Sequence, residues 1–306
     1  MKHDSNKVAI IGCGNVGMTA AYALLHTGLI NELLLVGRNK DSLVGEQLDL
    51  EHGMSFLPNC RISVTDDYAD LIDTDVVIYS AGAAQKPGET RLDLCAKNCE
   101  ILESILPQVI HHAPNAVILI VSNPVDILTY KAYQLAKLPK GRIFGTGTTL
   151  DTARFRFHLS DFLKVNAQSI HAYILGEHGD SSFPAISSAT VGGQPLTSLS
   201  KFNQERAVKA FKAAQKAAYK IIETKGSTYY GIGTVVSHIV AKILRNSRTV
   251  LPVSMPLHNY LDISGVALSV PCVIGRNGVE DMLEIRLDWE EKQQLEKSAD
   301  ALKKYL

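Results

Sequence analysis

The chain has 306 residues, of which 46% are hydrophobic and 20% charged, a composition typical of a globular protein long enough for two domains. Lys plus Arg and Asp plus Glu both total 31, so no net charge favours nucleic acid or an anionic membrane as a partner. The chain start lacks an apolar signal region, and no run of about 18 apolar residues could cross a bilayer. The five cysteines are scattered and odd in number. We therefore expect a cytoplasmic protein with reduced cysteines.

The first half alternates short β-branched runs with helical patterns, which predicts a doubly wound parallel sheet covered on both faces. Helices are expected between the strands, with Gly28 as the C-cap of the first helix. The clearest strands are predicted at residues 8–11, 33–36, 76–79 and 117–121, and the helices near 16–27, 41–54, 91–112 and 124–137.

The second half of the chain combines helical and strand patterns without regular alternation. Helices are predicted near 148–163, 204–225 and 228–246, and strands at 168–175 and across 250–287. Asp288 and Glu291 form a capping box that starts a final amphipathic helix. We expect residues 147–306 to form a mixed α+β catalytic domain packed on the first, with the active site in the cleft between the halves.

A glycine motif follows the first strand directly and opens a helix. Gly12 permits the tight turn, Gly14 allows the backbone to approach a pyrophosphate, and Gly17 allows close packing of helix on strand. The helix N-terminus adds free N–H groups for the phosphates. The pattern predicts that residues 1–146 form a Rossmann-type dinucleotide-binding domain; the alternative is a glycine-rich turn without a ligand.

The second strand departs from the usual dinucleotide pattern. An acid that binds the adenosine ribose is expected about 20 residues after the glycines. Gly37 and Arg38 stand there instead, so the repulsion of a 2′-phosphate is absent and a cation is adjacent. We predict that the cofactor is NAD and that NADP is also accepted; alternatively, Arg38 is a solvated turn residue.

Three segments carry groups suited to acid–base and anion chemistry. His178 follows a predicted strand, and a histidine is the natural proton carrier at neutral pH. Asp151 and Arg154 share one helix face, where the carboxylate can orient an imidazole and the guanidinium can bind a substrate carboxylate. The alternative is an intrahelical ion pair. A polar loop ends at Arg91, which could polarise a carbonyl; the alternative is a plain surface loop.

Five motifs together resemble those of the L-lactate/malate dehydrogenase family, over nearly the whole chain. They are GlyCysGlyAsnValGly (12–17), AlaGlnLysProGlyGluThrArgLeuAspLeu (84–94), SerAsnProValAsp (122–126), GlyThrThrLeuAspThrAlaArgPheArg (147–156) and GlyGluHisGlyAsp (176–180). The resemblance implies reversible hydride transfer between a nicotinamide cofactor and a 2-keto acid.

The resemblance also assigns roles to residues. His178 would be the proton donor and acceptor with Asp151 as its partner, Arg154 the carboxylate clamp and Arg91 the residue that polarises the carbonyl. Asn123 would bind the substrate oxygen, and Thr228 would line the side-chain end of the pocket. The implied cofactor contacts are Gly12, Gly14, Asn15, Val16, Gly17, Gly37, Arg38, Tyr68, Gly82, Ala83, Ser104, Val121, Ser122, Asn123 and Thr146. No metal site is predicted.

Gln85 separates the branches of this family, since its malate enzymes carry an arginine at that position. Oxaloacetate would bury an unpaired carboxylate against the neutral amide, whereas the methyl group of pyruvate would not. The sequence therefore favours pyruvate and L-lactate as substrate and product. The alternative substrate is a bulkier 2-keto acid, as in hydroxyisocaproate dehydrogenases. A non-catalytic dinucleotide sensor is disfavoured, because it would not explain why four such residues occur together; they are Arg91, Asp151, Arg154 and His178.

Arg156 and His171 match positions at which bacterial members of the family bind fructose 1,6-bisphosphate between subunits. Arg156 lies two residues after Arg154 and so points away from the substrate side of the same helix. The resemblance implies this effector and a homotetramer, or a dimer; the alternative is two ordinary surface bases.

Overall fold

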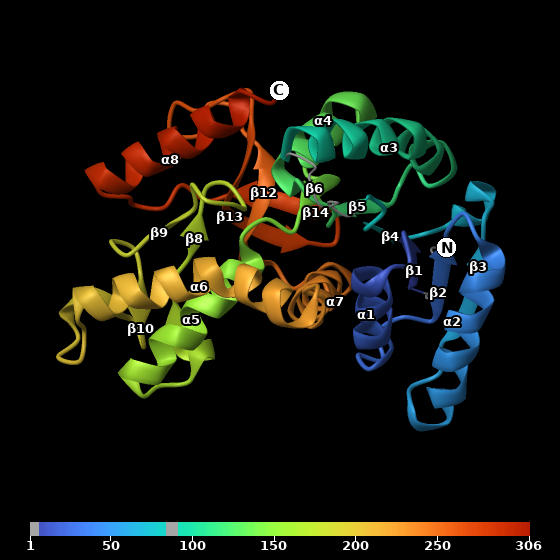
Figure 1. Cartoon of the computed structure of the whole chain (residues 1–306), viewed down its shortest axis with the longest axis horizontal. Helices are drawn as coiled ribbons and strands as arrows, with labels where there is room; N and C mark the ends of the chain where they lie inside the picture. The colour runs from blue at the N-terminus through green and yellow to red at the C-terminus, as the bar shows by residue number, and fades with distance from the viewer. Residues whose placement is uncertain (1–5, 84–90) are drawn as a thin grey trace.

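The computed structural model describes residues 6–83 and 91–306, and its centre is one nine-stranded sheet flanked by helices (Figure 1). The strands, in the order in which they lie across the sheet, are β14 (Gly278–Met282), β13 (Ala267–Gly275), β12 (Thr249–Pro256), β6 (Ile143–Gly145), β5 (Val117–Ile120), β4 (Val76–Tyr79), β1 (Lys7–Ile11), β2 (Glu32–Val36) and β3 (Arg61–Thr65). The helices are α1 (Asn15–Leu25), α2 (Lys40–Gly53), α3 (Arg91–His112), α4 (Val125–Ala136), α5 (Thr149–Leu163), α6 (Gln204–Lys225), α7 (Tyr230–Leu244) and α8 (Trp289–Lys303).

Strands β1 to β6 run parallel, in the order β3-β2-β1-β4-β5-β6, which confirms the predicted doubly wound sheet. Alternate side chains enter opposite layers, as the strand period of two requires. Ile10 belongs to a core shared with α1 and α7, and Ile11 belongs to a core shared with α3 and α4. Both faces are therefore apolar and covered, which explains the continuous β-branched runs of the sequence.

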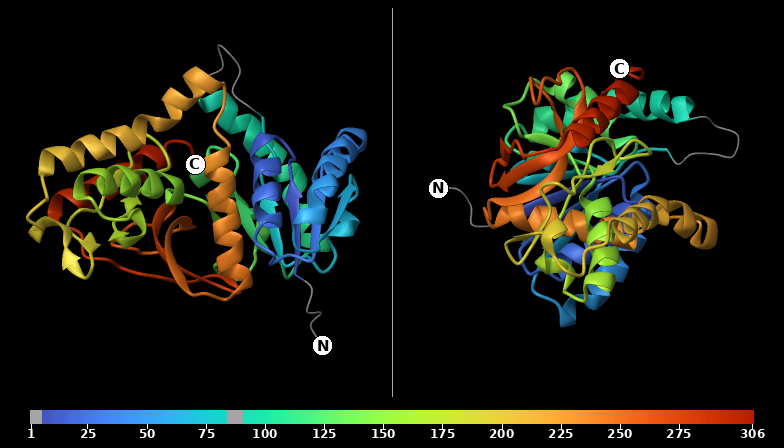
Figure 2. Two further views of the ribbon diagram at one scale, coloured as in Figure 1. Left: turned by 90° about the horizontal axis from the view of Figure 1, so that it is seen from below. Right: turned by 90° about the vertical axis from the view of Figure 1, so that its left-hand side faces the viewer.

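Helix α7 of the second half packs on α1 of the first half, and Figure 2 shows the two helices beside each other. A Cβ atom at Gly233 would lie 2.5 Å from the side chain of Thr19, so the close approach of the helices requires a glycine at that position. This contact places the loop before α7 next to the glycine turn of the first half.

The sheet of the second half differs from the prediction. We expected the second half to be a mixed α+β domain packed on the first, but β12 pairs edge to edge with β6, where Ser254 lies opposite Gly145, and β13 and β14 continue the same sheet. Strand β6 would otherwise expose unpaired backbone groups, and pairing with β12 satisfies them. The two halves thus share one sheet and not only a packed interface.

Two local predictions were also wrong. The strand expected at 168–175 is broken into a 3₁₀ turn and two short strands, β7 (Ile170–His171) and β8 (Ile174–Leu175), which pair with different partners. The carbonyl of Ala172, between them, accepts from Nε of Arg156 and not from a neighbouring strand. Helix α1 is capped by His26, and Gly28 lies two residues further on, at a φ of 65° in the turn toward β2.

Three further short strands, β9 (Phe183–Pro184), β10 (Thr190–Val191) and β11 (Gln194–Pro195), lie in the loops between α5 and α6. Within residues 6–83 and 91–306, no helix is both long and apolar enough to span a membrane.

Candidate active site

The glycine turn between β1 and α1 is shaped for close backbone approach. Gly12 has a φ of 93°, and a Cβ atom there would lie 2.4 Å from the backbone nitrogen of Ala81 on the neighbouring strand connection. A Cβ atom at Gly17 would lie 2.3 Å from the carbonyl oxygen of Gly12, whereas Gly14 faces open space, with nothing within 4 Å. The turn therefore fits a dinucleotide, with room at Gly14 for phosphates that the N-terminus of α1 would bind.

A cavity of about 300 Å³ lies beside this turn, at the carboxyl ends of the parallel strands. Ligands of open α/β sheets bind at this edge. The lining includes six of the predicted cofactor residues together with three others, and comprises Val16, Ser80, Gly82, Ala83, Leu94, Asn98, Val121, Ser122 and Asn123.

Asn98 was not predicted, and it organises the cavity wall. Its Oδ1 accepts from the backbone N–H of Ala83 at 2.7 Å, and its Nδ2 donates to the carbonyl of Asn123 at 2.7 Å. The Asn98 side chain is buried, so α3 holds two predicted site segments at fixed positions. Ser80 and Ser122 act similarly, through hydroxyl bonds to the carbonyls of Gly12 and Ala81 at 2.7 and 2.6 Å.

Five other predicted cofactor residues do not line this cavity. Gly37 directly follows β2 and its N–H donates to the carbonyl of Thr65, while Arg38 is exposed next to it. Tyr68 is half-buried; burial raises its pKa and the nearby Arg38 charge opposes that rise. Thr146 is buried just after β6, whereas the Ser104 hydroxyl is exposed and bonds back to Ile101 of its own helix.

His178, Asp151 and Arg154 form a contiguous chain of contacts. Nδ1 of His178 lies 2.7 Å from Oδ2 of Asp151, and the guanidinium of Arg154 lies 3.3 Å from Oδ1 of the same carboxylate. Helix α5 supplies both partners from one face, and the loop after β8 supplies the histidine. The structure thus brings together the three residues predicted to carry the chemistry.

The electrostatics of this group favour a charged imidazole. Burial opposes the charge on His178, but the carboxylates of Asp151 and Asp126 outweigh it and raise the pKa of His178 to about 9. Burial likewise opposes the charge on Asp151, but His178 and Arg154 hold the pKa of that carboxyl below its ordinary value. The contact of Nδ1 with Asp151 leaves Nε2 as the ring nitrogen of His178 that could exchange a proton with a ligand.

The loop that carries His178 is tethered from three helices. The His178 N–H donates to Oδ2 of Asp126 on α4 at 2.7 Å, and the Glu177 N–H donates to Oγ of Ser298 on α8 at 2.6 Å. The hydroxyl of Tyr219 on α6 donates to Asp180 at 3.1 Å. Sequence reasoning missed these tethers. The motif at 122–126 was the only signal for Asp126, and nothing in the sequence pointed to Ser298.

Two predicted substrate residues have limited structural description. Gln85 lies outside the described residues, and Arg91 is the first residue of α3. Thr228 is half-buried, two residues before α7, and the adjacent Ser227 hydroxyl lies 3.4 Å from Nδ2 of Asn15 at the glycine turn. The segment that contains Thr228 therefore lies beside the glycine turn of the proposed cofactor site.

The predicted effector residues lie close together on the second half. Nε of Arg156 donates to the carbonyl of Ala172 at 2.9 Å, and its guanidinium lies 5.3 Å from the ring centre of Tyr173. His171, the residue before Ala172, is exposed on β7. Burial lowers the pKa of Arg156, and Tyr173 opposes that effect.

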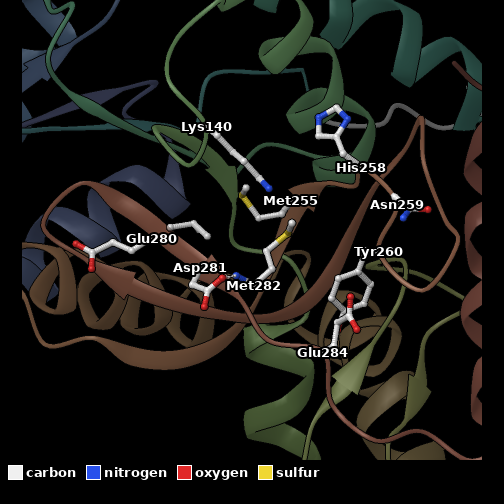
Figure 3. Close-up of a pocket in the computed structure, with 10 residues that line it drawn as sticks. Lys140, Met255, His258, Asn259, Tyr260, Glu280, Asp281, Met282 and Glu284 are labelled. Atoms are coloured by element: carbon white, nitrogen blue, oxygen red, sulfur yellow. Dashed lines mark hydrogen bonds between the residues drawn. The ribbon is translucent and has the colours of Figure 1, made fainter.

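A second cavity, of about 230 Å³, is separate from all the predicted residues. Figure 3 shows Lys140 extending toward Met255 in its wall, with the acidic side chains of Glu280, Asp281 and Glu284 around it. Across the part of the chain that the structure describes, no group of three or more His, Cys, Asp or Glu side chains could hold a metal ion.

A dinucleotide cradle, an acid-paired histidine and a partly buried arginine together define a class, the nicotinamide-dependent dehydrogenases. Residues 6–145 match the NAD binding domain of lactate/malate dehydrogenases, and residues 148–306 match the α/β C-terminal domain of the same family. The chain belongs to the lactate/malate dehydrogenase family, as its motifs predicted, and NAD is the cofactor.

Curated relatives and solved structures agree with this assignment. The chain is 43% identical to L-lactate dehydrogenase 1 of Clostridium acetobutylicum, over 99% of this chain and 98% of that protein. It is also 43% identical to L-lactate dehydrogenase 2 of Lactococcus lactis, over 100% and 99%. The crystal structure of a minor L-lactate dehydrogenase from Enterococcus mundtii, in a ligand-bound form, is similar with a TM-score of 0.95 and 39% identity, covering 99% of this chain and 98% of that one.

Proposed function

We propose that this protein is an L-lactate dehydrogenase that reduces pyruvate to L-lactate and catalyses the reverse reaction. The observation that carries the proposal is the contact between His178 and Asp151 at 2.7 Å, with Arg154 on the same carboxylate. An acid, its orienting base and a carboxylate-binding cation are the groups that a 2-keto acid requires. We propose residues 1–146 as the cofactor unit and 147–306 as the substrate unit.

Each side chain then has a separate task. Arg154 binds the pyruvate carboxylate, and Nε2 of His178 donates a proton to the ketone oxygen while Asp151 stabilises the imidazolium. Arg91 and Asn123 polarise that oxygen, and Thr228 with Gln85 borders the methyl group. Bound NADH supplies the hydride. The NADH would bind at the glycine turn (Gly12, Gly14, Asn15, Val16 and Gly17) and in the cavity lined by Gly82 and Asn123.

Substrate choice is tested with a matrix of four keto acids: pyruvate, oxaloacetate, 2-ketoisocaproate and phenylpyruvate. We expect the highest kcat/KM for pyruvate, and a loss of at least about 100-fold for oxaloacetate because its second carboxylate meets the neutral Gln85. A preference for oxaloacetate would contradict the proposal. A preference for 2-ketoisocaproate would assign the same mechanism to a hydroxyisocaproate-type enzyme.

We propose that NADPH is accepted beside NADH, because Gly37 offers no charge against a 2′-phosphate and Arg38 is exposed next to it. Gly37→Asp tests this proposal. A Cβ atom at Gly37 would meet only the end of the Leu43 side chain, at 3.2 Å, so the variant can fold. We expect NADPH turnover to fall at least about tenfold and NADH turnover to be kept. Arg38→Gln is the matched variant for the cation, and unchanged cofactor ratios in both variants would reject the proposal.

We further propose regulation by fructose 1,6-bisphosphate at Arg156 and His171, in a cytoplasmic homotetramer or dimer. Their proximity on β7 and α5 supports a shared phosphate site. Five cysteines without a disulfide suit a reducing compartment. The test is the KM for pyruvate and the oligomer mass with and without the bisphosphate, in the wild type and in His171→Gln. A wild-type enzyme whose KM and mass do not respond would contradict the proposed regulation.

A further inference from the structure

A buried carboxylate contacts the backbone of His178, in addition to the Asp151 carboxylate that contacts its ring. Asp126 is the second residue of α4, in the first half of the chain, and is only 3% exposed. Its Oδ2 accepts from the backbone N–H of His178 at 2.7 Å. Among the described residues, its Oδ1 has no hydrogen-bond partner. A buried charge is costly unless it is paired or hydrogen-bonded, so the contact with the His178 N–H and the nearby imidazole matter for this carboxylate.

The surroundings of Asp126 show which groups control its charge. Burial raises the pKa of Asp126 to about 6, and the Ser254 hydroxyl on β12, the His178 N–H and the His178 charge oppose that rise, while Glu177 adds to it. Asp151 on α5 contacts Nδ1 of the His178 ring, and Arg154 on the same helix contacts Asp151. A residue with a side chain at position 145 would collide with Thr129 and Ser254, so the junction of β6 and β12 keeps this buried pocket tightly packed.

We propose that Asp126 is a second carboxylate of the catalytic centre, a positioning residue that fixes His178 through its main chain and whose negative charge helps to keep the imidazole protonated. Asp151 holds the ring from Nδ1, and Asp126 holds the backbone of the same residue, so the histidine is fixed at two points from two halves of the chain. The charge of Asp126 acts in the same direction as that of Asp151. This inference rests on the proposed role of His178 as proton carrier.

Asp126→Asn and Asp126→Ala separate the two parts of this role. The asparagine variant keeps an oxygen that can accept from the His178 N–H but removes the charge, whereas the alanine variant removes both. In the cofactor-free protein, NMR titration of the His178 ring should shift to lower pH by about one unit in Asp126→Asn. In steady state, the alkaline limit of pyruvate reduction should shift by the same amount, with the KM for NADH unchanged. Asp126→Ala should also lower kcat by at least about tenfold.

Asp161→Asn is the matched control, because it removes an exposed carboxylate from α5 whose side chain is 84% accessible. A titration curve and pH profile of Asp126→Asn identical to those of the wild type would overturn the proposal. A purely structural role would lower thermal stability without moving either curve, and this result would overturn it as well.

Ser254→Ala keeps the proposal testable if Asp126 variants do not fold. The serine hydroxyl is buried, and its loss should raise the pKa of Asp126 and move the acid limit of turnover to higher pH. An acid limit at the wild-type pH would count against the proposal. A wild-type enzyme that turns over none of the four keto acids would refute the proposed function instead, and the His178 titration would still decide whether Asp126 acts on the imidazole.

Discussion

Oδ2 of Asp151 lies 2.7 Å from Nδ1 of His178, and this contact leaves Nε2 as the only ring nitrogen able to reach a substrate. Asp151 also contacts Arg154, so one carboxylate contacts both the proposed proton donor and the proposed carboxylate clamp. The spacing of three residues along α5 makes this geometry possible, because both side chains project from the same face.

Asp151→Asn tests the contribution of this carboxylate. The amide cannot stabilise an imidazolium, so we expect kcat for pyruvate reduction to fall by at least about 100-fold with little change in NADH binding. Steady-state kinetics and NADH fluorescence titration measure the two quantities. Asp161→Asn on the same helix is the control and should retain wild-type turnover. If Asp151→Asn retained more than about half of the activity, His178 would not depend on Asp151.

The raised pKa of His178, about 9, predicts opposite pH profiles for the two directions of the reaction. Pyruvate reduction needs the protonated ring, so its kcat/KM should be constant from about pH 7 to about pH 9 and should fall about tenfold per pH unit above pH 9. L-Lactate oxidation needs the neutral ring, so its kcat/KM should rise up to about pH 9. Profiles recorded from pH 6 to 10 check both limbs. Two profiles that change in the same direction would exclude His178 as the shared proton carrier.

Arg154→Lys tests the carboxylate clamp. A lysine keeps the charge but loses the planar pair of donors that binds a carboxylate through two parallel hydrogen bonds. We expect the KM for pyruvate to rise by at least about 100-fold, with NADH affinity retained. Arg206→Lys, at the start of α6, is the control for an arginine outside the site. An unchanged KM would assign the substrate carboxylate to another cation.

Local patterns predicted the parallel half well, and the structure places His178, Asp151 and Arg154 in one chain of contacts. Runs such as that of β1 are apolar on both faces, and the glycine turn has a sequence signature of its own, so the parallel half could be predicted from local patterns. His178, Asp151 and Arg154 were predicted from residue chemistry and family motifs, and the contact between His178 and Asp151 depends on a loop and a helix 27 residues apart.

Long-range pairing explains what the sequence did not predict. The edge pairing of β12 with β6 joins Ser254 to Gly145, and no local pattern distinguishes an added strand from a separate sheet. The predicted strand is interrupted at Ala172, whose carbonyl accepts a hydrogen bond from the Arg156 side chain on α5. Asp126, Asn98 and Ser298 act through backbone groups of distant segments, which a single sequence does not reveal.

Ser298→Ala tests whether the C-terminal helix holds the catalytic loop. The Ser298 hydroxyl is fully buried, accepts from the Glu177 N–H at 2.6 Å and lies 3.0 Å from the Ser181 hydroxyl. Gly176, just before, has a φ of 89°, and a Cβ atom there would lie 2.6 Å from the same hydroxyl oxygen, so α8 presses directly on the turn that leads to His178.

Removing the hydroxyl takes the acceptor from a buried N–H, which should lower the free energy of unfolding by about 1–3 kcal/mol. Because the histidine loop would also be less fixed, kcat should fall by about tenfold while the KM for NADH stays the same. Urea unfolding and steady-state kinetics measure the two effects. Ser160→Ala on α5, whose hydroxyl bonds to Phe157 one turn earlier, is the matched serine control and should change neither. A Ser298→Ala enzyme that is less stable but has wild-type kcat would limit α8 to a structural role.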